Sequence, residues 1–483
     1  MGKVLVIDVG TRFLKAFLFD DNGYLRKQEK REVSILSPFP GLVEQDPIEL
    51  FDKAMEAVSS IVKGEKVDGI AVTGNRATTL MWDDKGNPLY NSIVWMDSRG
   101  YQVVKKAKLK IDLPEELTKL LLYPHASSVF IRWIIDNVKG VKEKVKEGKA
   151  FFGNPNSYLI WRLTGGKVHA TDPSNASSTG LFDPYSLTWW DQVAEMLSIP
   201  TSILPEVKEN VDDYGLVEAG PSEIKGVRII ASIADQQSSL LGQLCTRKGE
   251  AKVTNGSGSF VDVNTGESMI ISSHGLIPMV SWKIGNRVNY MLEGYIAFSG
   301  ELMLWLKEIG IIEDIGKIDD MATSVKDSNG VYLIPAFTGL PAPYNDPSAT
   351  GLIIGLTRGV KKEHIVRAAL ESIAMMVSEI IEDVRLDAGV DVEVIRADGN
   401  LSRSDFLLEK IASFSGKVIE RSNNLEGTGL GAALLALIGL GKASIDEIRE
   451  MKSVEKAFAP NSTEGKEKLS KWRVAVEKSR GWK

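Results

Sequence analysis

The chain of 483 residues is too long for one hydrophobic core, so at least two domains are expected. Its 43% hydrophobic and 25% charged residues are typical of a globular protein, and a net charge of −6 argues against nucleic acid as a partner and favours small molecules. Cys245 is the only cysteine, which excludes an internal disulfide and argues against a thiolate metal site.

The strand-like start Lys3–Ile7 runs into a polar turn, which does not resemble a signal peptide, and no apolar run is long enough to span a membrane. The sequence therefore predicts a cytoplasmic protein with no membrane partner.

Runs of β-branched residues alternate with amphipathic patterns, which is typical of α/β domains. In the first part we expect strands at Val4–Val9, Phe17–Phe19, Asp68–Val72 and Val227–Ile233, and helices at Ile48–Val62, across most of 113–163, and at Gln236–Leu244. The β pattern restarts at Lys248–Gly266, which predicts a domain boundary near 245–250. The second part predicts strands at Gly330–Ala336 and Val392–Ala397 and helices at Lys362–Val384 and Gly429–Ile438.

Two features concern packing in the last part of the chain. Small residues fill the predicted helix 429–438, so it is expected to approach another backbone closely. The polar, Lys-rich tail after Lys442 contains Trp472 in a short amphipathic helix, which is expected to dock on the body of the protein.

Asp235, Gln236 and Gln237 come directly after the apolar run 227–233, at a predicted strand end. A carboxylate there can accept a proton from a substrate hydroxyl, while the two amides hold neighbouring hydroxyls without adding charge. Asp235 is therefore a candidate catalytic base. The alternative is that Asp235 only caps the helix that follows.

Two glycine-containing turns follow predicted strands, at Asp8–Thr11 and at Asn255–Phe260. Glycines let backbone N–H groups approach an anion, and hydroxyl groups add donors, so each turn is a candidate phosphate loop. Asp8 is a candidate Mg²⁺ ligand, directly or through water. Neither turn is a Walker A loop, and a simple hairpin turn is the alternative for each.

These motifs, with others in the same order along the chain, resemble the FGGY family of carbohydrate kinases, most closely its glycerol kinase branch. The matching segments are Asp8–Thr11, Tyr90–Asp97, His169–Ser177, Ala234–Gln237, Gly256–Phe260, Pro335–Leu340 and Gly355–Gly359 with His364, Arg367 and Glu371. The resemblance implies an α/β fold with two actin/hexokinase-like (ribonuclease H-like) domains around a central cleft. It implies a sugar- or polyol-binding domain at 1–246, a nucleotide-binding domain at 247–442 and a helical tail at 443–483.

The resemblance also implies roles for single residues, with ATP and Mg²⁺ as cofactors. Asp235 is the base, and the residues expected to bind the sugar or polyol are Arg76, Ala77, Trp95, His125, Asp235, Gln236 and Phe260. The residues expected to face the nucleotide are Gly10, Thr11, Lys15, Gly256, Ser257, Gly300, Gly399, Asn400 and Ser404. A homodimer or homotetramer is a hypothesis, because kinases of this family often form such oligomers.

The chain departs from the glycerol kinase pattern at the substrate site. Ala77 stands where glycerol kinases carry a glutamate, and His125 stands where they carry a tyrosine. Losing two hydroxyl partners weakens transition-state binding unless other groups replace them, so a longer polyol or a ketopentose is expected rather than glycerol. A buried structural histidine is the alternative for His125.

The chain also departs from the family at the nucleotide site. The Asp-Gly-Gly turn is Asp398-Gly399-Asn400 here, and it can still form because Asn tolerates positive φ. Ser404 replaces an asparagine that often reaches the adenine.

The leading hypothesis is an ATP-dependent sugar or polyol kinase with Asp235 as general base. A xylulose-type ketopentose kinase, a catalytically weak sugar-binding sensor and an actin-like ATPase are the alternatives. Asp235 and both candidate phosphate loops favour the kinase over the sensor, and Trp95 and Phe260 favour it over the ATPase.

Overall fold

The computed structural model describes residues 2–101, 103–104, 123–461 and 465–482. The chain folds into two compact units. Unit 1 comprises Met1–Gly242, Met279–Asn289 and Thr428–Met451, and unit 2 comprises Gln243–Pro278, Tyr290–Gly427 and Lys452–Lys483. Each unit combines a sheet with helices, so the α/β prediction is confirmed.

Unit 1 is built on a five-stranded sheet in the order β13-β5-β1-β2-β3. The strands are β1 (Lys3–Val9), β2 (Phe13–Asp20), β3 (Leu25–Glu32), β5 (Val67–Gly74) and β13 (Ile229–Ala234). β1, β2 and β3 are antiparallel neighbours, whereas β1, β5 and β13 are parallel. The four strands predicted here are confirmed with shifted ends. β3 was not predicted, because its exposed, charged residues lack an apolar face.

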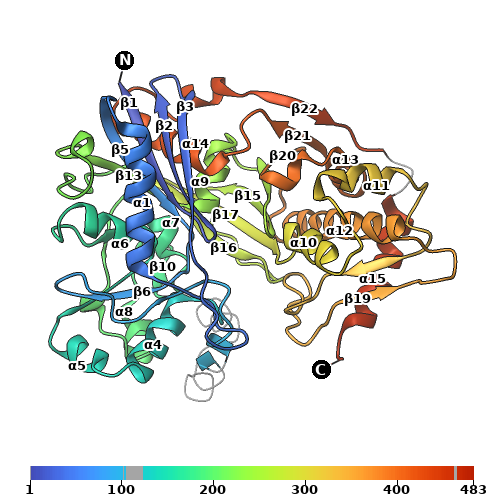
Figure 1. The fold of residues 1–483 in the computed structure, drawn as a ribbon, viewed down its shortest axis with the longest axis horizontal. Helices are drawn as coiled ribbons and strands as arrows, with labels where there is room; N and C mark the ends of the chain where they lie inside the picture. The colour runs from blue at the N-terminus through green and yellow to red at the C-terminus, as the bar shows by residue number, and fades with distance from the viewer. Residues whose placement is uncertain (1, 102, 105–122, 462–464, 483) are drawn as a thin grey trace. The chain divides into compact units, whose positions relative to one another are not determined.

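Helix α1 (Pro47–Val62) lies along this sheet, as Figure 1 shows in blue. The Asp46 side chain accepts the Ile48 N–H at 2.8 Å, and Pro47 occupies the first turn, where it loses no helical hydrogen bond. The buried residues of α1, among them Leu50, Ala54 and Val58, pack into the core with the strands. The predicted helix at 48–62 is confirmed.

The segment 113–163 is less helical than predicted. Residues 113–122 lie outside the described part of the chain, and the remainder holds α4 (Ser127–Asn137), α5 (Val141–Lys146), β8 (Ala150–Gly153) and α6 (Pro155–Leu163). β8 pairs with β6 (Leu80–Asp83), a contact distant in sequence that local periodicity does not show. Further elements of unit 1 are β4 (Glu44–Gln45), β7 (Ser92–Ile93), β9 (Ala170–Thr171), α7 (Pro173–Ala176), β10 (Phe182–Asp183), β11 (Thr188–Trp189), α8 (Asp191–Met196), β12 (Glu206–Val207) and α9 (Asp235–Gly242).

Most strands of unit 2 belong to a sheet with the order β16-β17-β15-β14-β20-β21-β22. Its strands are β14 (Ala251–Asn255), β15 (Ser259–Gly266), β16 (Ile277–Ile284), β17 (Arg287–Ile296), β20 (Val394–Asp398), β21 (Val418–Ser422) and β22 (Val454–Phe458). β17, β15 and β14 are antiparallel neighbours, and β14, β20 and β21 are parallel. These five strands match the order and directions of the sheet in unit 1, although β16 intervenes along the chain between β15 and β17. The strands β14 and β15 lie within the predicted restart of the β pattern at 248–266.

The core of unit 2 surrounds α12 (Lys362–Ala388), a helix of 27 residues whose middle is almost entirely buried. Figure 1 shows α10 (Gly300–Glu308), α11 (Ile318–Thr323) and α13 (Asp405–Ser415) near it. The strand predicted at 330–336 is shorter than expected: β18 covers only Tyr332–Ile334. It pairs with β19 (Leu352–Ile354). Across the described ranges, no helix is both long and apolar enough to cross a membrane.

Two packing predictions for the last part of the chain are confirmed. In α14 (Gly427–Gly439), a Cβ at Gly431 would lie 1.8 Å from the Ser238 carbonyl oxygen, so only glycine allows this approach to α9. In α15 (Gly465–Ser479), Trp472 is fully buried and its Nε1–H donates to Glu379 Oε2 at 3.0 Å.

Helix α12 carries a buried carboxyl group at Asp383, which is 7% exposed. Its Oδ2 has no hydrogen-bond partner among the described residues. Burial raises the pKa of Asp383 to about 6, and the negative charges of Glu379 and Asp387 add to the shift while His274 and Arg473 oppose it. Because the folded state binds this proton more tightly, the contribution of Asp383 to stability is complete below about pH 4 and is lost as the pH rises through 6.

We therefore expect Asp383→Asn to stabilise the protein at pH 7.5 by at most about 3 kcal/mol and to have little effect at pH 4, as measured by thermal unfolding. Asp84→Asn, which changes an exposed carboxylate, is the control. Equal melting temperatures for wild type and Asp383→Asn at both pH values would contradict this account.

Candidate active site

The carboxyl ends of three parallel strands lie in register in unit 1. Val9 of β1 pairs with Gly74 of β5, and Gly74 pairs with Ala234 of β13. The residues that follow these strands are therefore brought to one edge of the sheet: Gly10 and Thr11, Asn75 and Arg76, and Asp235 and Gln236. In open α/β sheets, ligands bind beyond this edge.

Asp235 is the first residue of α9 and is partly exposed. Its Oδ1 accepts the N–H of Gln236 at 2.8 Å, and its Oδ2 lies 3.5 Å from Gln236 Nε2. The Asp235 carbonyl accepts a hydrogen bond from the Thr428 hydroxyl at 3.4 Å, which holds the start of α9 against α14.

A buried polar network holds the end of β13. The Asp172 carboxylate accepts the N–H groups of Ser174 and Asn175 at 3.0 and 3.1 Å, as well as the Ser232 hydroxyl at 2.7 Å. The Ser174 hydroxyl in turn accepts the N–H of Ala234 at 2.9 Å, one residue before Asp235. Burial raises the pKa of Asp172, opposed by its donors. Asp172 thus scaffolds its own turn.

Arg76 lies beside the start of α9. Its Nη1 donates to Gln237 Oε1 at 3.3 Å and lies 3.0 Å from the sulfur of Met279. Gln237 is fully buried, and its Nε2 donates to the backbone carbonyls of Ser174 and Val280 at 3.4 and 3.3 Å. Gln237 therefore positions Arg76, whereas the sequence assigned it a substrate hydroxyl.

Ala77 has a φ of +62°, a conformation that is uncommon for residues other than glycine. The bonds around it explain why it persists: its N–H donates to the Ser178 hydroxyl at 3.2 Å, and its carbonyl accepts from Thr79 and Ser127 at 3.1 and 3.3 Å. Unusual backbone conformations that are held by their surroundings are common at functional sites.

The first glycine turn meets Trp95. The Trp95 Nε1–H donates to the Thr11 hydroxyl at 3.1 Å, and the Gln45 Nε2 donates to the Thr11 carbonyl at 2.7 Å. The Gly10 N–H donates to the Phe13 carbonyl at 3.1 Å and so closes the hairpin turn. Trp95, which was expected to bind the substrate, therefore bonds to Thr11, which was expected to face the phosphates. The hydrogen bond from Gln45 was not predicted.

His125 lies close to this group. Burial lowers the pKa of His125, although bonds to the backbone of Trp95 and Asp97 oppose the shift. The ring packs edge-on against Tyr101 with centroids 5.7 Å apart, and Nδ1 is buried with no hydrogen-bond partner among the described residues. We assign the proton to Nε2, the nitrogen left to bond the backbone, which makes Nδ1 an acceptor. A satisfied structural histidine would not leave this atom unpaired.

Asp8 and Lys15 face each other across β1 and β2, and Asp8 is also opposite Thr73 of β5. Asp8 is buried at the start of the first glycine turn, two residues before Gly10. The described residues contain no group of three or more His, Cys, Asp or Glu side chains that could hold a metal ion.

The second glycine turn in unit 2 is supported by the start of α10. The Gly256 carbonyl accepts the N–H of Gly300 at 3.0 Å, and the Ser257 carbonyl accepts the N–H groups of Ser299 and Glu301 at 2.9 and 3.1 Å. The predicted cluster of Gly256, Ser257 and Gly300 is thus brought together. The turn itself closes through the Gly256 N–H and the Gly258 carbonyl at 2.8 Å.

The sequence analysis did not predict the hydrogen bonds between side-chain hydroxyl and amide groups beside the second glycine turn. The Ser259 hydroxyl bonds to Asn255 Oδ1 at 2.7 Å and to the Ser299 hydroxyl at 2.8 Å, and Asn255 Nδ2 donates to the Ser402 hydroxyl at 3.0 Å. The next residue after Ser259 is Phe260, whose ring stacks on Tyr295 with centroids 6.0 Å apart.

Gly399 and Asn400 follow β20, beside the same turn. Gly399 has a φ of +83°, and a Cβ there would lie 2.5 Å from the Asn255 carbonyl oxygen. Asn400 begins a short 3-10 helix (Asn400–Arg403) and does not have positive φ. The prediction that Asn400 adopts positive φ in this turn is therefore wrong. Gly399 is the residue with positive φ, and position 400 accepts Asn without backbone strain.

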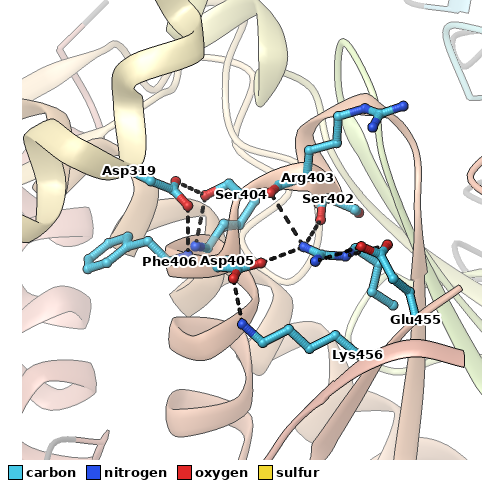
Figure 2. A network of polar contacts seen from close by, with 10 residues as sticks. Asp319, Ser402, Arg403, Ser404, Asp405, Phe406, Glu455 and Lys456 are labelled. Carbon is cyan, nitrogen blue, oxygen red and sulfur yellow. Dashed lines mark hydrogen bonds and ion pairs between the residues drawn. The ribbon is translucent and has the colours of Figure 1, made fainter. Parts of the chain in front are cut away.

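Ser404 has a structural role in unit 2, as Figure 2 shows. Its hydroxyl accepts the N–H of Leu407 at 3.0 Å to cap α13 and also bonds to Asp319, whose carboxylate accepts the N–H of Phe406 at 3.1 Å. A ligand that bonds to the Ser404 hydroxyl would share it with these partners. Its expected contact with the nucleotide stays a prediction.

Comparisons with known proteins agree with this architecture. Residues 3–242 match the N-terminal domain, and residues 251–440 the C-terminal domain, of the FGGY family of carbohydrate kinases. The chain belongs to this family. It is 40% identical to glycerol kinase 2 of Thermotoga maritima, with 100% of this chain and 99% of the relative aligned.

Solved structures show the same fold. Glycerol kinase of Plasmodium falciparum with ADP matches with a TM-score of 0.92 and 32% identity, covering 99% of this chain and 98% of that chain. A ligand-bound xylulose kinase of Lactobacillus acidophilus matches with a TM-score of 0.85 at 21% identity, covering 99% of this chain and 97% of that chain, which shows the fold alone. The chain is therefore an ATP-dependent carbohydrate kinase of the glycerol-kinase-like type.

We expect Ser174→Ala to lower kcat and leave the KM for ATP unchanged, because it leaves the buried N–H of Ala234 unpaired next to Asp235. The lost bond should also lower stability by about 1–3 kcal/mol, measured by thermal unfolding. The exposed Ser186→Ala is the control. A Ser174→Ala enzyme with wild-type kcat would show that the network does not position Asp235.

Proposed function

We propose that this kinase transfers the γ-phosphoryl group of ATP to a terminal hydroxyl of a sugar or polyol, with Asp235 as general base. The observation that carries the proposal is the register of β1, β5 and β13, which places the first glycine turn, Arg76 and Asp235 at one edge of a sheet. Unit 1 would hold the acceptor and the base, and unit 2 would supply the second phosphate loop and the nucleotide contacts.

Phosphoryl transfer needs little covalent chemistry from the protein beyond positioning and charge stabilisation. Asp235 would accept the proton of the attacking hydroxyl, and Gln236, whose amide lies 3.5 Å from the Asp235 carboxylate, would bind a neighbouring hydroxyl. Arg76, oriented by Gln237, would bind a further oxygen of the acceptor. Trp95 and Phe260 would contact its carbon chain.

The phosphates would lie on the two glycine turns. The Thr11 hydroxyl accepts from Trp95, so its own O–H is available as a donor to a phosphate oxygen. The second turn contains Gly256 and Ser257 and lies beside Gly300, Gly399 and Asn400. Lys15 would add a positive charge at the first turn. Mg²⁺ would neutralise the phosphates, with Asp8 holding it directly or through water.

Two residues distinguish the acceptor from glycerol. Ala77 supplies no carboxylate where glycerol kinases carry glutamate, and its small side chain leaves room for additional carbon atoms. His125 offers a buried acceptor nitrogen without a partner in place of a tyrosine hydroxyl. A polyol or ketose longer than glycerol, with a hydroxyl that donates to His125 Nδ1, satisfies both positions, because an unpaired buried acceptor is costly.

Removal of the base tests the proposed chemistry. We expect Asp235→Asn to lower kcat by roughly 10²–10⁴, while ATP and acceptor each still raise the melting temperature. The measurement is ADP release from MgATP with glycerol, tetritols, pentitols, ketopentoses and gluconate as acceptors. The control is Asp191→Asn, which changes an exposed carboxylate.

The same assay separates the alternatives. Substrate-dependent turnover that survives in Asp235→Asn would reject Asp235 as base. Thermal stabilisation by an acceptor without any turnover would support the sugar sensor instead, and ATP hydrolysis that no acceptor accelerates would support the actin-like ATPase.

The double variant Ala77→Glu/His125→Tyr tests the assignment of the acceptor. It is expected to raise kcat/KM for glycerol at least tenfold and to lower it for the best longer acceptor, with the KM for ATP unchanged. Since Ala77 already has positive φ, glutamate adds little backbone strain there. If the wild-type enzyme prefers glycerol to every longer acceptor, the specificity assignment is wrong.

A further inference from the structure

Gln45 is a fully buried residue beside the first glycine turn of unit 1. It ends β4, where it lies opposite Ser92 of β7, and the Ser92 hydroxyl donates to its backbone carbonyl at 2.9 Å. The Gln45 Nε2 donates to the Thr11 carbonyl at 2.7 Å, a bond between residues 34 positions apart in the sequence. Gln45 thus links β4 to the turn, although no role in the reaction was assigned to it.

The residues on either side of Gln45 are anchored in the protein. The Glu44 carboxylate accepts hydrogen bonds from the Tyr90 hydroxyl and from Arg99 Nη2, each at 2.6 Å. On the other side, the Asp46 side chain caps α1. The Gln45 side chain therefore reaches the turn from a rigid support, as a group that orients a functional loop requires.

The bond to Thr11 determines the orientation of the Gln45 amide. Flipping the amide would place Oε1 against the Thr11 carbonyl oxygen, and two acceptors repel each other, so the donor must face Thr11. As a result, Oε1 is buried with no hydrogen-bond partner among the residues that the structure describes. Buried polar atoms without partners are rare and call for a specific explanation, and a need for the donor at this turn supplies one.

Thr11 is held at both its backbone and its side chain. Gln45 binds the Thr11 carbonyl, and the Trp95 Nε1–H donates to the Thr11 hydroxyl at 3.1 Å. The peptide bond between Thr11 and Arg12 is trans, so the Arg12 N–H points away from the carbonyl and from Gln45. The bond from Gln45 therefore fixes the direction of the Arg12 N–H as well.

We propose that Gln45 is a positioning residue for the first phosphate loop. By binding the Thr11 carbonyl, it keeps the Arg12 N–H, beside the Thr11 hydroxyl, directed towards the phosphates of ATP. Without this donor the plane of the 11–12 peptide is no longer fixed, and its rotation brings the carbonyl oxygen, which repels an anion, towards the phosphates. The inference rests on the proposed function, in which this turn binds phosphate.

Removal of the donor tests this role. Gln45→Met keeps the length of the side chain and is expected to raise the KM for ATP roughly 10–100-fold, with less than about a threefold change in the KM for the acceptor. Calorimetric titration with Mg²⁺ and a non-hydrolysable ATP analogue should show the same loss of affinity. Gln28→Met, at an exposed position of β3, is the control and should match the wild type.

Calorimetry separates a failure of this inference from a failure of the proposed function, because it needs no turnover. A wild type that binds the analogue but phosphorylates no acceptor would reject the proposed function alone. Wild-type affinity in Gln45→Met would overturn the role of Gln45 alone, and a wild type that binds no analogue would overturn both.

Gln45→Glu separates positioning from a purely structural role, because it places a titratable donor at the same point. A buried carboxylate cannot donate to the Thr11 carbonyl, whereas the protonated carboxyl group donates its O–H. We expect the ratio of kcat/KM for ATP between Gln45→Glu and Gln45→Met to rise roughly fivefold or more as the pH falls from about 8.5 to about 5.5. The ratio between Gln28→Glu and Gln28→Met should stay constant, and a constant ratio at position 45 would overturn the proposal.

Discussion

The register of three parallel strands is the constraint on which the candidate site depends. Hydrogen bonds between β1, β5 and β13 end at aligned residues, and the chain leaves the sheet at the same level three times. Asn156 of α6 reinforces this alignment, because its Nδ2 donates to the carbonyls of Val72 and Ile233 at 3.3 and 3.0 Å. Buried amides that bridge two strands are costly to leave unpaired, so they fix the strands' relative positions.

The polar network around Asp172 continues this constraint to Asp235, the proposed base. Its carboxylate collects donors from α7, from Ser232 of β13 and from Asn210, and Ser174 then binds the last amide of β13. Asp235 is therefore positioned by groups that are too deeply buried to contact a ligand. In unit 2, strands of matching order and direction place a second glycine turn beside Gly399 and the start of α10.

The sequence predicted most of the framework, because strand periodicity and glycine positions are local properties. The strands that carry Asp8, Asp235 and the second turn, and the long helix α12, were all identified. Contacts between distant segments were not: β8 was hidden in an apparently helical stretch, since its pairing with β6 is a tertiary contact. Asn400 was expected to need positive φ, whereas Gly399 supplies it.

At the site, residue types were easier to predict than their partners. Gln237 was expected to bind substrate, but its burial and its bonds to two backbone carbonyls and Arg76 make it a positioning group. The unpaired nitrogen of His125 is visible only in three dimensions. Motifs therefore supply candidate residues, whereas the hydrogen-bond partners of those residues are set by contacts between distant segments.

A crystal structure with a non-hydrolysable ATP analogue, Mg²⁺ and the best acceptor would test the central claim most directly. The account predicts that a carboxylate oxygen of Asp235 lies about 2.6–3.2 Å from the acceptor hydroxyl nearest the γ-phosphate. A reacting hydroxyl beyond the reach of Asp235, bonded instead to another basic group, would contradict it.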